Sequence, residues 1–319
     1  MYTEEKAREL VIQAGNMLVE KGLVARTWGN VSARCGEDEM IITPSGIAYD
    51  LLTPEKLVKV NINDLSYDGD IKPSSEKGIH AAVYEMRDEV QFVIHTHQQY
   101  ASAIAADERD LPYAPCAKYG LPGTKGLMKH VVKCVDAHRN HKMFLLAKHG
   151  ALLLGESMEE AFNLADMLEL DCKEEFKSRI PDMDPIGWPG VNPDTFKTDE
   201  MPYVKLVQDE FVGECMKAGI TVKPYLDDFA QMVGPDMKIV DAGKFKLDGG
   251  MLGRNAVIIK GIGAVCVGKT EDDCDAIATI VSKNCGAACY VRKAPPLSVA
   301  DAYLQRYIYL NKYSKKKEG

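Results

Sequence analysis

Two histidines placed two residues apart are the strongest chemical feature of this sequence. His95 and His97 follow the apolar residues 92–94, a pattern that indicates a strand with a buried start. On a strand the side chains of residues i and i+2 point to one face, about 7 Å apart, so Thr96 faces the other way. Two imidazoles placed in this way can bind one divalent cation. The alternative is a pair of polar residues on an exposed strand face.

Two further residues have suitable chemistry but a less specific context. His149 ends an apolar run just before Gly150, where a lone histidine is more often a packed turn residue than a ligand. Glu76 ends the segment KPSSE at residues 72–76, which is typical of a helix N-cap followed by an acid in the first turn. If the two lie near a metal, the histidine is a ligand and the carboxylate an acid or base.

Two short glycine-containing segments have the composition of ordinary turns. Residues 29–32 read GNVS and residues 43–46 read TPSG. These segments also offer backbone N–H groups, hydroxyls and an amide, which together can bind a phosphate without a lysine.

Hydrophobic periodicity places these residues on alternating helices and strands. Thr3 can cap the first helix and Gly22 can end it, and Ser157 and Glu160 are spaced as a capping box. The expected helices cover residues 4–21, 75–87, 100–106 and 158–177, and the expected strands cover residues 39–43, 57–62, 91–97, 143–148 and 151–154.

The second half of the chain partly repeats the first. Residues 145–155 read LLAKHGALLLG and residues 257–268 read VIIKGIGAVCVG, each followed by an expected helix. Ile262 stands where His149 stands in the first copy. We therefore expect three parts: a catalytic domain over residues 1–180, a proline-rich linker over 181–202, and a smaller related, non-catalytic domain over 203–319.

Composition narrows the class of protein. The chain has 319 residues, 46% of them hydrophobic and 27% charged, with a net charge of −8. An acidic chain without a long apolar run predicts neither a nucleic-acid partner nor a membrane partner. The nine cysteines form no Cys-x-x-Cys pair and the N-terminus does not read as a signal peptide, so we expect reduced thiols and a cytoplasmic protein.

Five motifs in one order carry a family resemblance: GNVS, TPSG, PSSE, HTH and HG. Over about residues 5–180 the chain resembles the class II aldolase/adducin family, and most closely its L-fuculose-phosphate aldolase branch. The resemblance implies an α/β fold, a three-layer α/β/α sandwich around a mostly antiparallel sheet, followed here by the smaller domain. It also implies a metal-dependent carbon–carbon lyase that cleaves a ketose 1-phosphate to dihydroxyacetone phosphate and an aldehyde.

The same resemblance assigns roles to individual residues. The metal ligands would be His95, His97 and His149, and zinc is the expected ion, with manganese or cobalt as alternatives. Glu76 would be the catalytic acid/base, and Tyr119 a proton donor. A packed loop tyrosine is the alternative for Tyr119. The implied phosphate-binding residues are Thr27, Gly29, Asn30, Ser45, Gly46, Ser74 and Ser75.

Four other histidines match no ligand position, and we expect them on solvated helix faces. They are His80, His130, His138 and His141.

Three alternative functions remain within the family. An L-ribulose-5-phosphate 4-epimerase typically carries Pro-Ser-Ser-Asp where this chain has Glu76, and a methylthioribulose-1-phosphate dehydratase shares the scaffold. An adducin-like scaffold would lack the ligands that this chain retains. The resemblance also implies a small phosphorylated sugar as substrate and a homo-oligomer with sites between subunits. The alternative is a smaller assembly, in which the fused second domain replaces a neighbouring subunit.

Overall fold

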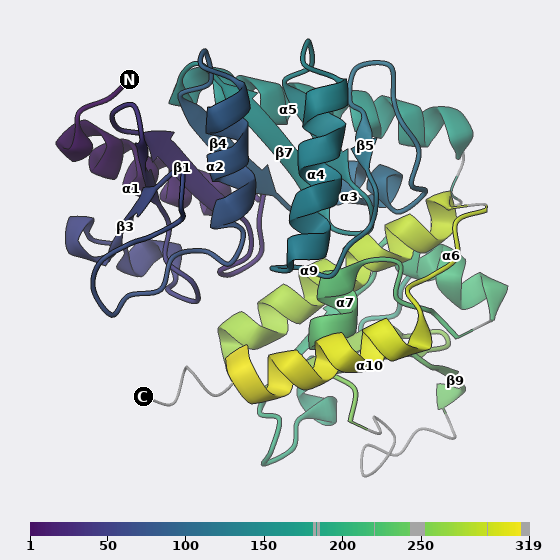
Figure 1. Ribbon diagram of the computed structural model, residues 1–319. Coiled ribbons are helices and arrows are strands. Elements are labelled where there is room, and N and C mark those ends of the chain that lie inside the picture. The colour runs from purple at the N-terminus through teal and green to yellow at the C-terminus, as the bar shows by residue number, and fades with distance from the viewer. Residues whose placement is uncertain (181–182, 184–185, 220, 243–252, 292, 314–319) are drawn as a thin grey trace. The chain divides into compact units, whose positions relative to one another are not determined.

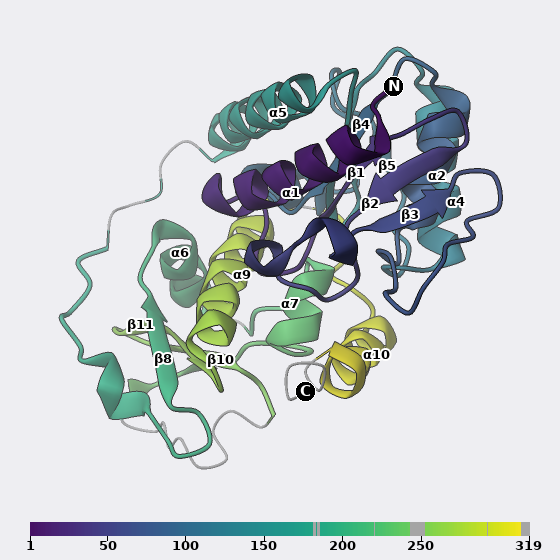
Figure 2. The same cartoon turned by 90° about the vertical axis from the view of Figure 1, so that its left-hand side faces the viewer.

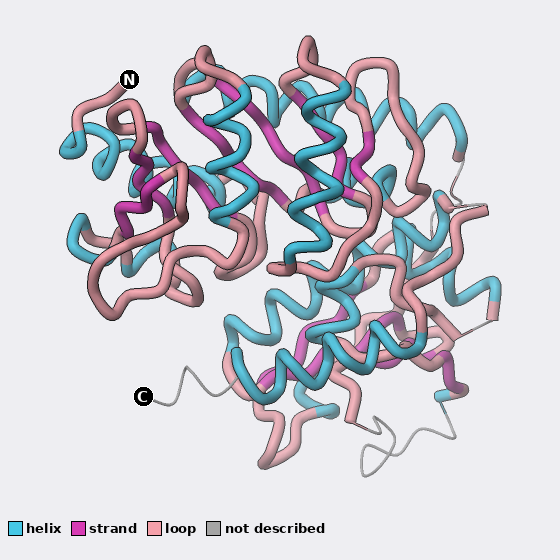
Figure 3. The backbone as a smooth tube through the Cα atoms, in the orientation of Figure 1, coloured by secondary structure: helices cyan, strands magenta, loops and turns pink. Residues whose placement is uncertain are grey.

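The computed structural model describes the chain apart from residues 181–182, 184–185, 220, 243–252, 292 and 314–319. The chain divides into two compact units, Met1–Lys173 and Glu174–Gly319, and the division falls inside one long helix, α5 (Met158–Arg179). Each unit combines helices with its own sheet (Figure 3). Each described helix falls short of the length or the hydrophobicity that a bilayer-spanning helix requires.

A seven-stranded sheet forms the centre of the first unit. Its strand order is β3-β2-β1-β4-β7-β6-β5, and every neighbouring pair is antiparallel except β5 and β6. The mostly antiparallel sheet expected from the sequence is thus confirmed. The strands are β1 (Asn30–Arg34), β2 (Glu39–Ile42), β3 (Val58–Asn61), β4 (Phe92–Thr96), β5 (Cys116–Ala117), β6 (Met143–Leu146) and β7 (Gly150–Gly155).

Helices cover both faces of this sheet, which confirms the expected three layers. In Figures 1 and 2, α2 and α4 lie on one face and α1 and α5 on the other. Buried apolar side chains such as Val83, Val131 and Leu152 join α2 and α4 to the sheet. The remaining bounds are α1 (Glu4–Glu20), α2 (Lys77–Met86), α3 (Gln99–Ala105), α4 (Lys125–Ala137) and the 3₁₀ turns Tyr49–Leu51 and Pro54–Lys56.

Most of the expected elements form within two or three residues of their predicted ends. Thr3 caps α1 as expected, because its side chain accepts a hydrogen bond from the Lys6 N–H. The prediction of a turn over residues 29–32 was wrong, since Asn30–Arg34 is strand β1, paired with β2 on one side and β4 on the other. Polar residues at alternate positions concealed this buried strand, and helix α4 was not predicted.

The second unit contains a four-stranded sheet in the order β8-β11-β10-β9. The β8–β11 and β11–β10 pairs are antiparallel and the β10–β9 pair is parallel. The elements are β8 (Tyr203–Val207), β9 (Ile239–Val240), β10 (Ala256–Ile259), β11 (Gly263–Gly268), α6 (Glu210–Ala218), α7 (Asp227–Met232), α9 (Glu271–Tyr290), α10 (Val299–Ile308), the 3₁₀ turn Pro193–Phe196 and the π-helical turn Tyr309–Tyr313.

Candidate active site

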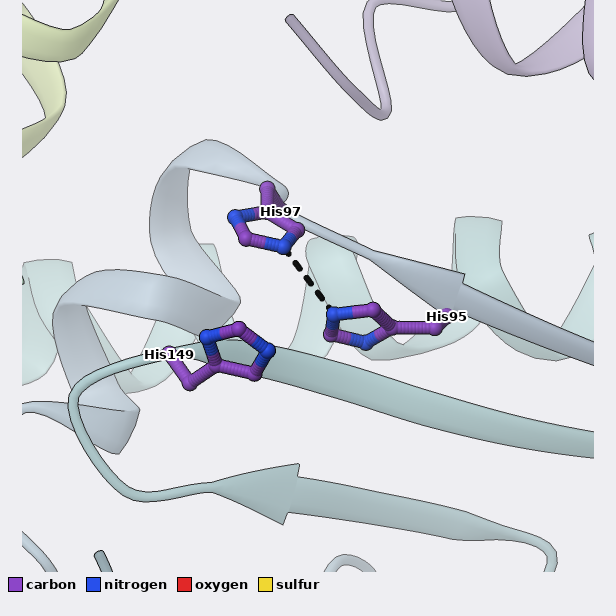
Figure 4. Close-up of side chains that lie close together, drawn as sticks. All are labelled: His95, His97 and His149. Atoms are coloured by element: carbon purple, nitrogen blue, oxygen red, sulfur yellow. Dashed lines mark hydrogen bonds between the residues drawn. The ribbon is translucent and has the colours of Figure 1, made fainter. Parts of the chain in front are cut away.

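The three histidines predicted as ligands converge in the first unit. His95 lies near the end of β4, His97 follows that strand, and His149 ends the turn between β6 and β7 (Figure 4). Their ring centroids are 4.7 to 4.8 Å apart, and their candidate ligand atoms lie within 4.8 Å of one another. All three side chains are buried. Residues separated by more than 50 positions therefore form one cluster.

The sheet places these rings through its register. His95 stands opposite Asn30 of β1 and Leu152 of β7, in the middle of the sheet. The backbone N–H of His149 donates to the Leu146 carbonyl at 3.0 Å and closes the turn between β6 and β7. That turn ends beside β4 because β7 pairs with β4.

His97 is held by a backbone hydrogen bond and by a ring contact with the segment before β1. Its N–H donates to the Leu23 carbonyl at 2.8 Å, and its ring is stacked with the ring of Trp28, with 6.2 Å between centroids. Gly29 adopts a φ of +75°, and a Cβ there would lie 2.6 Å from the carbonyl oxygen of His95. Only glycine lets this segment approach β4 so closely.

The tautomer of His95 suits a metal ligand. Its Nδ1 lies 2.8 Å from the Ala151 carbonyl oxygen, which can only accept, so Nδ1 carries a proton and, in the neutral ring, Nε2 presents a lone pair. That Nε2 lies 3.0 Å from His97 Nε2 and 3.5 Å from the Glu76 carboxylate. A lone pair facing these groups requires a proton or a cation between them. Three imidazoles beside a carboxylate fit a catalytic zinc-type ion.

Glu76 is buried against the histidine cluster. It stands at the N-cap position of α2, but its side chain makes no capping bond. Its Oε1 lies 3.1 Å from His149 Nε2, and its Oε2 accepts a hydrogen bond from the Asn30 amide at 2.9 Å. Burial alone raises the pKa of Glu76, but the neighbouring His95 and His149 and these hydrogen bonds outweigh it and hold the pKa well below its usual range. The carboxylate is aimed at the cluster.

The two loops predicted to bind phosphate lie side by side next to Glu76. The Ser74 N–H donates to the Thr43 carbonyl at 3.0 Å, and the Ser45 N–H donates to the Lys72 carbonyl at 2.8 Å. Ser74 is buried and its Oγ accepts from the Glu76 N–H. Ser45 is half-buried, and Gly46 and Ser75 are exposed. Thr27 is half-buried in the segment before β1, and Asn30 begins β1.

Tyr119 lies in a loop that runs beside the Ser75 loop. Gly123 has a φ of +68°, and a Cβ there would lie 2.8 Å from Ser75 Oγ. The Tyr119 carbonyl accepts a hydrogen bond from His130 Nδ1 at 2.7 Å, and the Tyr119 side chain is half-buried. The structure thus brings the backbone of this loop to the site's edge.

His80 is a site residue that sequence reasoning missed. We expected it on a solvated helix face, which was wrong, because its side chain is 0% exposed and hydrogen-bonds to Asn30 and Ser32. Burial lowers the pKa of His80 to about 3, reinforced by His95 and opposed by Glu76. Spacing could have revealed it, since residues 76, 80 and 84 share one helix face and residues 30 and 32 share one strand face.

Comparison with known proteins agrees with this geometry. Residues 9–176 match the family model described as Class II Aldolase and Adducin N-terminal domain. The chain is 29% identical over 209 residues to a 5-deoxy-D-ribulose 1-phosphate aldolase of Bacillus thuringiensis serovar kurstaki, covering 62% of this chain and 92% of the relative. It is 34% identical over 182 residues to the L-fuculose phosphate aldolase of Escherichia coli K12, covering 53% and 82%.

A solved structure shares both the fold and part of the sequence. It is an L-fuculose 1-phosphate aldolase, with a TM-score of 0.50 and 30% identity, covering 58% of this chain and 91% of that one. The relatives named here are aldolases, which are lyases. With the family model matching more than half of its residues, this chain belongs to the class II aldolase and adducin family.

Proposed function

We propose that the protein is a metal-dependent aldolase that cleaves a ketose 1-phosphate of the L-fuculose 1-phosphate type into dihydroxyacetone phosphate and an aldehyde. The observation that carries this proposal is the buried cluster of His95, His97 and His149 with the Glu76 carboxylate against it. The names of the relatives support the same substrate class.

The three imidazoles would hold a divalent cation, with zinc the first candidate. Such an ion supplies Lewis-acid stabilisation of the negative charge that develops on the three-carbon fragment. Because neutral imidazoles add no negative charge, His95, His97 and His149 leave the ion its full double charge. The cluster therefore suits a reaction that leaves a bonding electron pair on carbon.

Glu76 would move the proton on carbon. When the carbon–carbon bond breaks, the three-carbon fragment keeps the electron pair, and Glu76, which is ionised at rest and takes up a proton during the reaction, would deliver a proton to that carbon. In the reverse direction the ionised carboxylate removes the same proton. Tyr119 would handle the proton on the aldehyde oxygen.

The paired loops would bind the phosphate. The proposed contacts are Ser45, Gly46, Ser74 and Ser75, together with Thr27, Gly29 and Asn30, and an anchored phosphate would hold the reacting bond over the cluster. This remote binding contributes to catalysis by fixing orientation. We further propose that the protein works as a homo-oligomer.

A substrate panel tests this function. The pure protein is incubated with L-fuculose 1-phosphate, L-rhamnulose 1-phosphate, 5-deoxy-D-ribulose 1-phosphate and L-ribulose 5-phosphate, and dihydroxyacetone phosphate is assayed. We expect it to form from one or more of the 1-phosphates, to stop after chelation, and to resume with Zn²⁺, Mn²⁺ or Co²⁺. Epimerised pentulose phosphate without dihydroxyacetone phosphate would indicate the 4-epimerase instead. Metal-free protein that stays inactive on refilling would indicate a scaffold.

A further inference from the structure

A continuous chain of hydrogen bonds lies behind the Glu76 carboxylate. The Asn30 amide nitrogen donates to Glu76 Oε2 at 2.9 Å, and its oxygen bonds to His80 Nε2. His80 Nδ1 lies 2.7 Å from Ser32 Oγ, which lies 2.8 Å from the Tyr84 hydroxyl. The chain alternates between strand β1 and helix α2, so it ties the carboxylate to two rigid elements.

The Glu76 carboxylate determines which group is the donor in each hydrogen bond of the chain. An ionised Glu76 only accepts, so Asn30 must present its NH₂ to Glu76 and its oxygen to His80. His80 Nε2 must then carry the proton, and Nδ1 must accept from the Ser32 hydroxyl. The Tyr84 hydroxyl donates to Ser32, whose Oγ and carbonyl oxygen are 2.8 and 3.1 Å away. The whole chain therefore points its donors toward Glu76.

Burial makes this order rigid. Ser32, His80 and Tyr84 are 0% exposed and Asn30 is 4% exposed, so water has little access to replace a missing partner. A broken link would leave a buried polar group without its bond, which costs more than the bond contributes. The pKa of His80, about 3 because of burial, keeps the ring neutral at ordinary pH, as the donor order requires.

Packing alone does not explain a histidine at this position. Apart from Tyr84, the other buried side chains of α2, such as Ile79 and Val83, are apolar and join a continuous core. An apolar residue at position 80 would pack without the cost of burying two ring nitrogens.

We propose that His80 is a positioning residue: acting through Asn30, it fixes the orientation of the Glu76 carboxylate against the histidine cluster. This inference rests on the proposed function of Glu76. It also gives Asn30 a second task, because its oxygen is bonded to His80 and only its NH₂ group remains to meet a phosphate.

Three variants separate positioning from packing. His80→Leu breaks the hydrogen-bond chain and places an apolar side chain in the same position. His80→Gln keeps an N–H donor toward Asn30. Val83→Ala is the matched control, because it removes buried apolar volume from α2 without removing a member of the hydrogen-bond chain. Each variant is measured for melting temperature, bound metal, kcat and KM, and for deuterium uptake from D₂O into dihydroxyacetone phosphate, a step that needs the base but no aldehyde.

We expect His80→Leu to lower kcat and deuterium uptake about 10- to 100-fold, with KM and metal content nearly unchanged. His80→Gln should recover most of the loss, and Val83→Ala should lower only the melting temperature. Unchanged kcat in a folded, metal-loaded His80→Leu protein would overturn the inference. So would a loss of kcat that His80→Gln does not relieve or that Val83→Ala reproduces.

Failure of the proposed function is recognised separately. If the wild-type protein cleaves no ketose 1-phosphate, positioning is read from crystal structures of the wild-type and His80→Leu proteins. A Glu76 side chain that turns away from His149 in the variant supports the inference, and one that keeps its place refutes it, whatever the activity.

Discussion

Two β-hairpins, one in each unit, share a backbone but differ in chemistry. In β6–β7 and in β10–β11 a four-residue strand, a three-residue turn and a six-residue strand follow one another. The last turn residue, His149 or Ile262, donates its N–H to the end of the first strand at 3.0 Å in both. A Cβ at the next glycine, Gly150 or Gly263, would lie 2.1 or 2.8 Å from a carbonyl oxygen of the neighbouring strand. Both hairpins therefore need a glycine for the close approach, and Gly263 alone of the two also has a positive φ, of +122°.

The ligand positions are where the hairpins differ. Thr96 pairs with Ala151 in one unit and Val207 with Ala264 in the other, so Leu206 and Gln208 occupy the places of His95 and His97. The third place holds Ile262 instead of His149. We propose that the second unit is a related copy without metal. In both hairpins a glycine and the strand register are kept, whereas the side chains at the three ligand positions differ.

Exchanging the residues at the third ligand position, His149 and Ile262, gives the largest expected effect on metal binding and activity. His149→Ile should abolish stoichiometric metal and lower kcat/KM about 1000-fold or more, because a loss of about 4 kcal/mol of transition-state stabilisation equals three powers of ten. The fold should persist, since isoleucine occupies the corresponding turn of the second unit. The control Ile262→His should gain no metal beside Leu206. Elemental analysis and the dihydroxyacetone phosphate assay measure both, and a metal-loaded His149→Ile protein would refute the ligand assignment.

A variant that lacks the proposed base but keeps the three histidines separates proton transfer from metal binding. Glu76→Gln should lower kcat about 100- to 10,000-fold, the usual contribution of a general acid or base, while the three imidazoles still bind metal. Metal content and deuterium uptake into dihydroxyacetone phosphate are measured together. Retention of uptake at the wild-type rate would show that another group moves the proton.

The matching glycines predict a smaller effect in both hairpins. Gly150→Ala should lower the free energy of unfolding by about 2–4 kcal/mol, because its Cβ would meet the Thr96 carbonyl, and it should weaken metal binding. Gly263→Ala should destabilise the protein but leave metal binding intact. Denaturant unfolding and metal titration check both. If the two variants change metal affinity equally, the two hairpins are not independent.

The pH dependence of stability should also differ between the two units, because all seven histidines of the chain precede residue 150 and so belong to the first unit. The pKa of His80 is about 3 in the folded protein, below the ordinary 6.5, so between these values the unfolded chain binds a proton that the folded chain does not. Stability should therefore fall by about 1.4 kcal/mol for each pH unit lost in this window, from His80 alone. Denaturant titrations of wild-type and His80→Gln proteins measure this slope. An equally steep slope without His80 would contradict it.

Local sequence patterns predicted most helices and strands of the first unit. The family motifs predicted the cluster of three histidines and Glu76. His95 and His97 could be recognised as a pair because strand geometry relates i to i+2. His149 could be assigned only through the five-motif resemblance, because its approach to the pair depends on the β4–β7 pairing between distant residues.

Other features depend on tertiary structure that no single segment encodes. Strand β1 resembled a turn because Asn30 and Ser32 are polar, and the cost of burying these side chains is offset by their hydrogen bonds to His80 of α2. The same partnership hid His80, whose helix face was expected to meet water. The family model stops at residue 176, so the second unit is interpreted from its own hairpin.

The central place of β4 has a consequence for biosynthesis. His95 and His97 emerge from the ribosome more than 50 residues before His149, and the loop between them must close by adding β7 to β4. A nascent chain that ends before residue 149 holds only a two-histidine pair. An ion held by all three imidazoles would therefore be acquired late, by a nearly complete sheet, and its arrival would report that the sheet has closed.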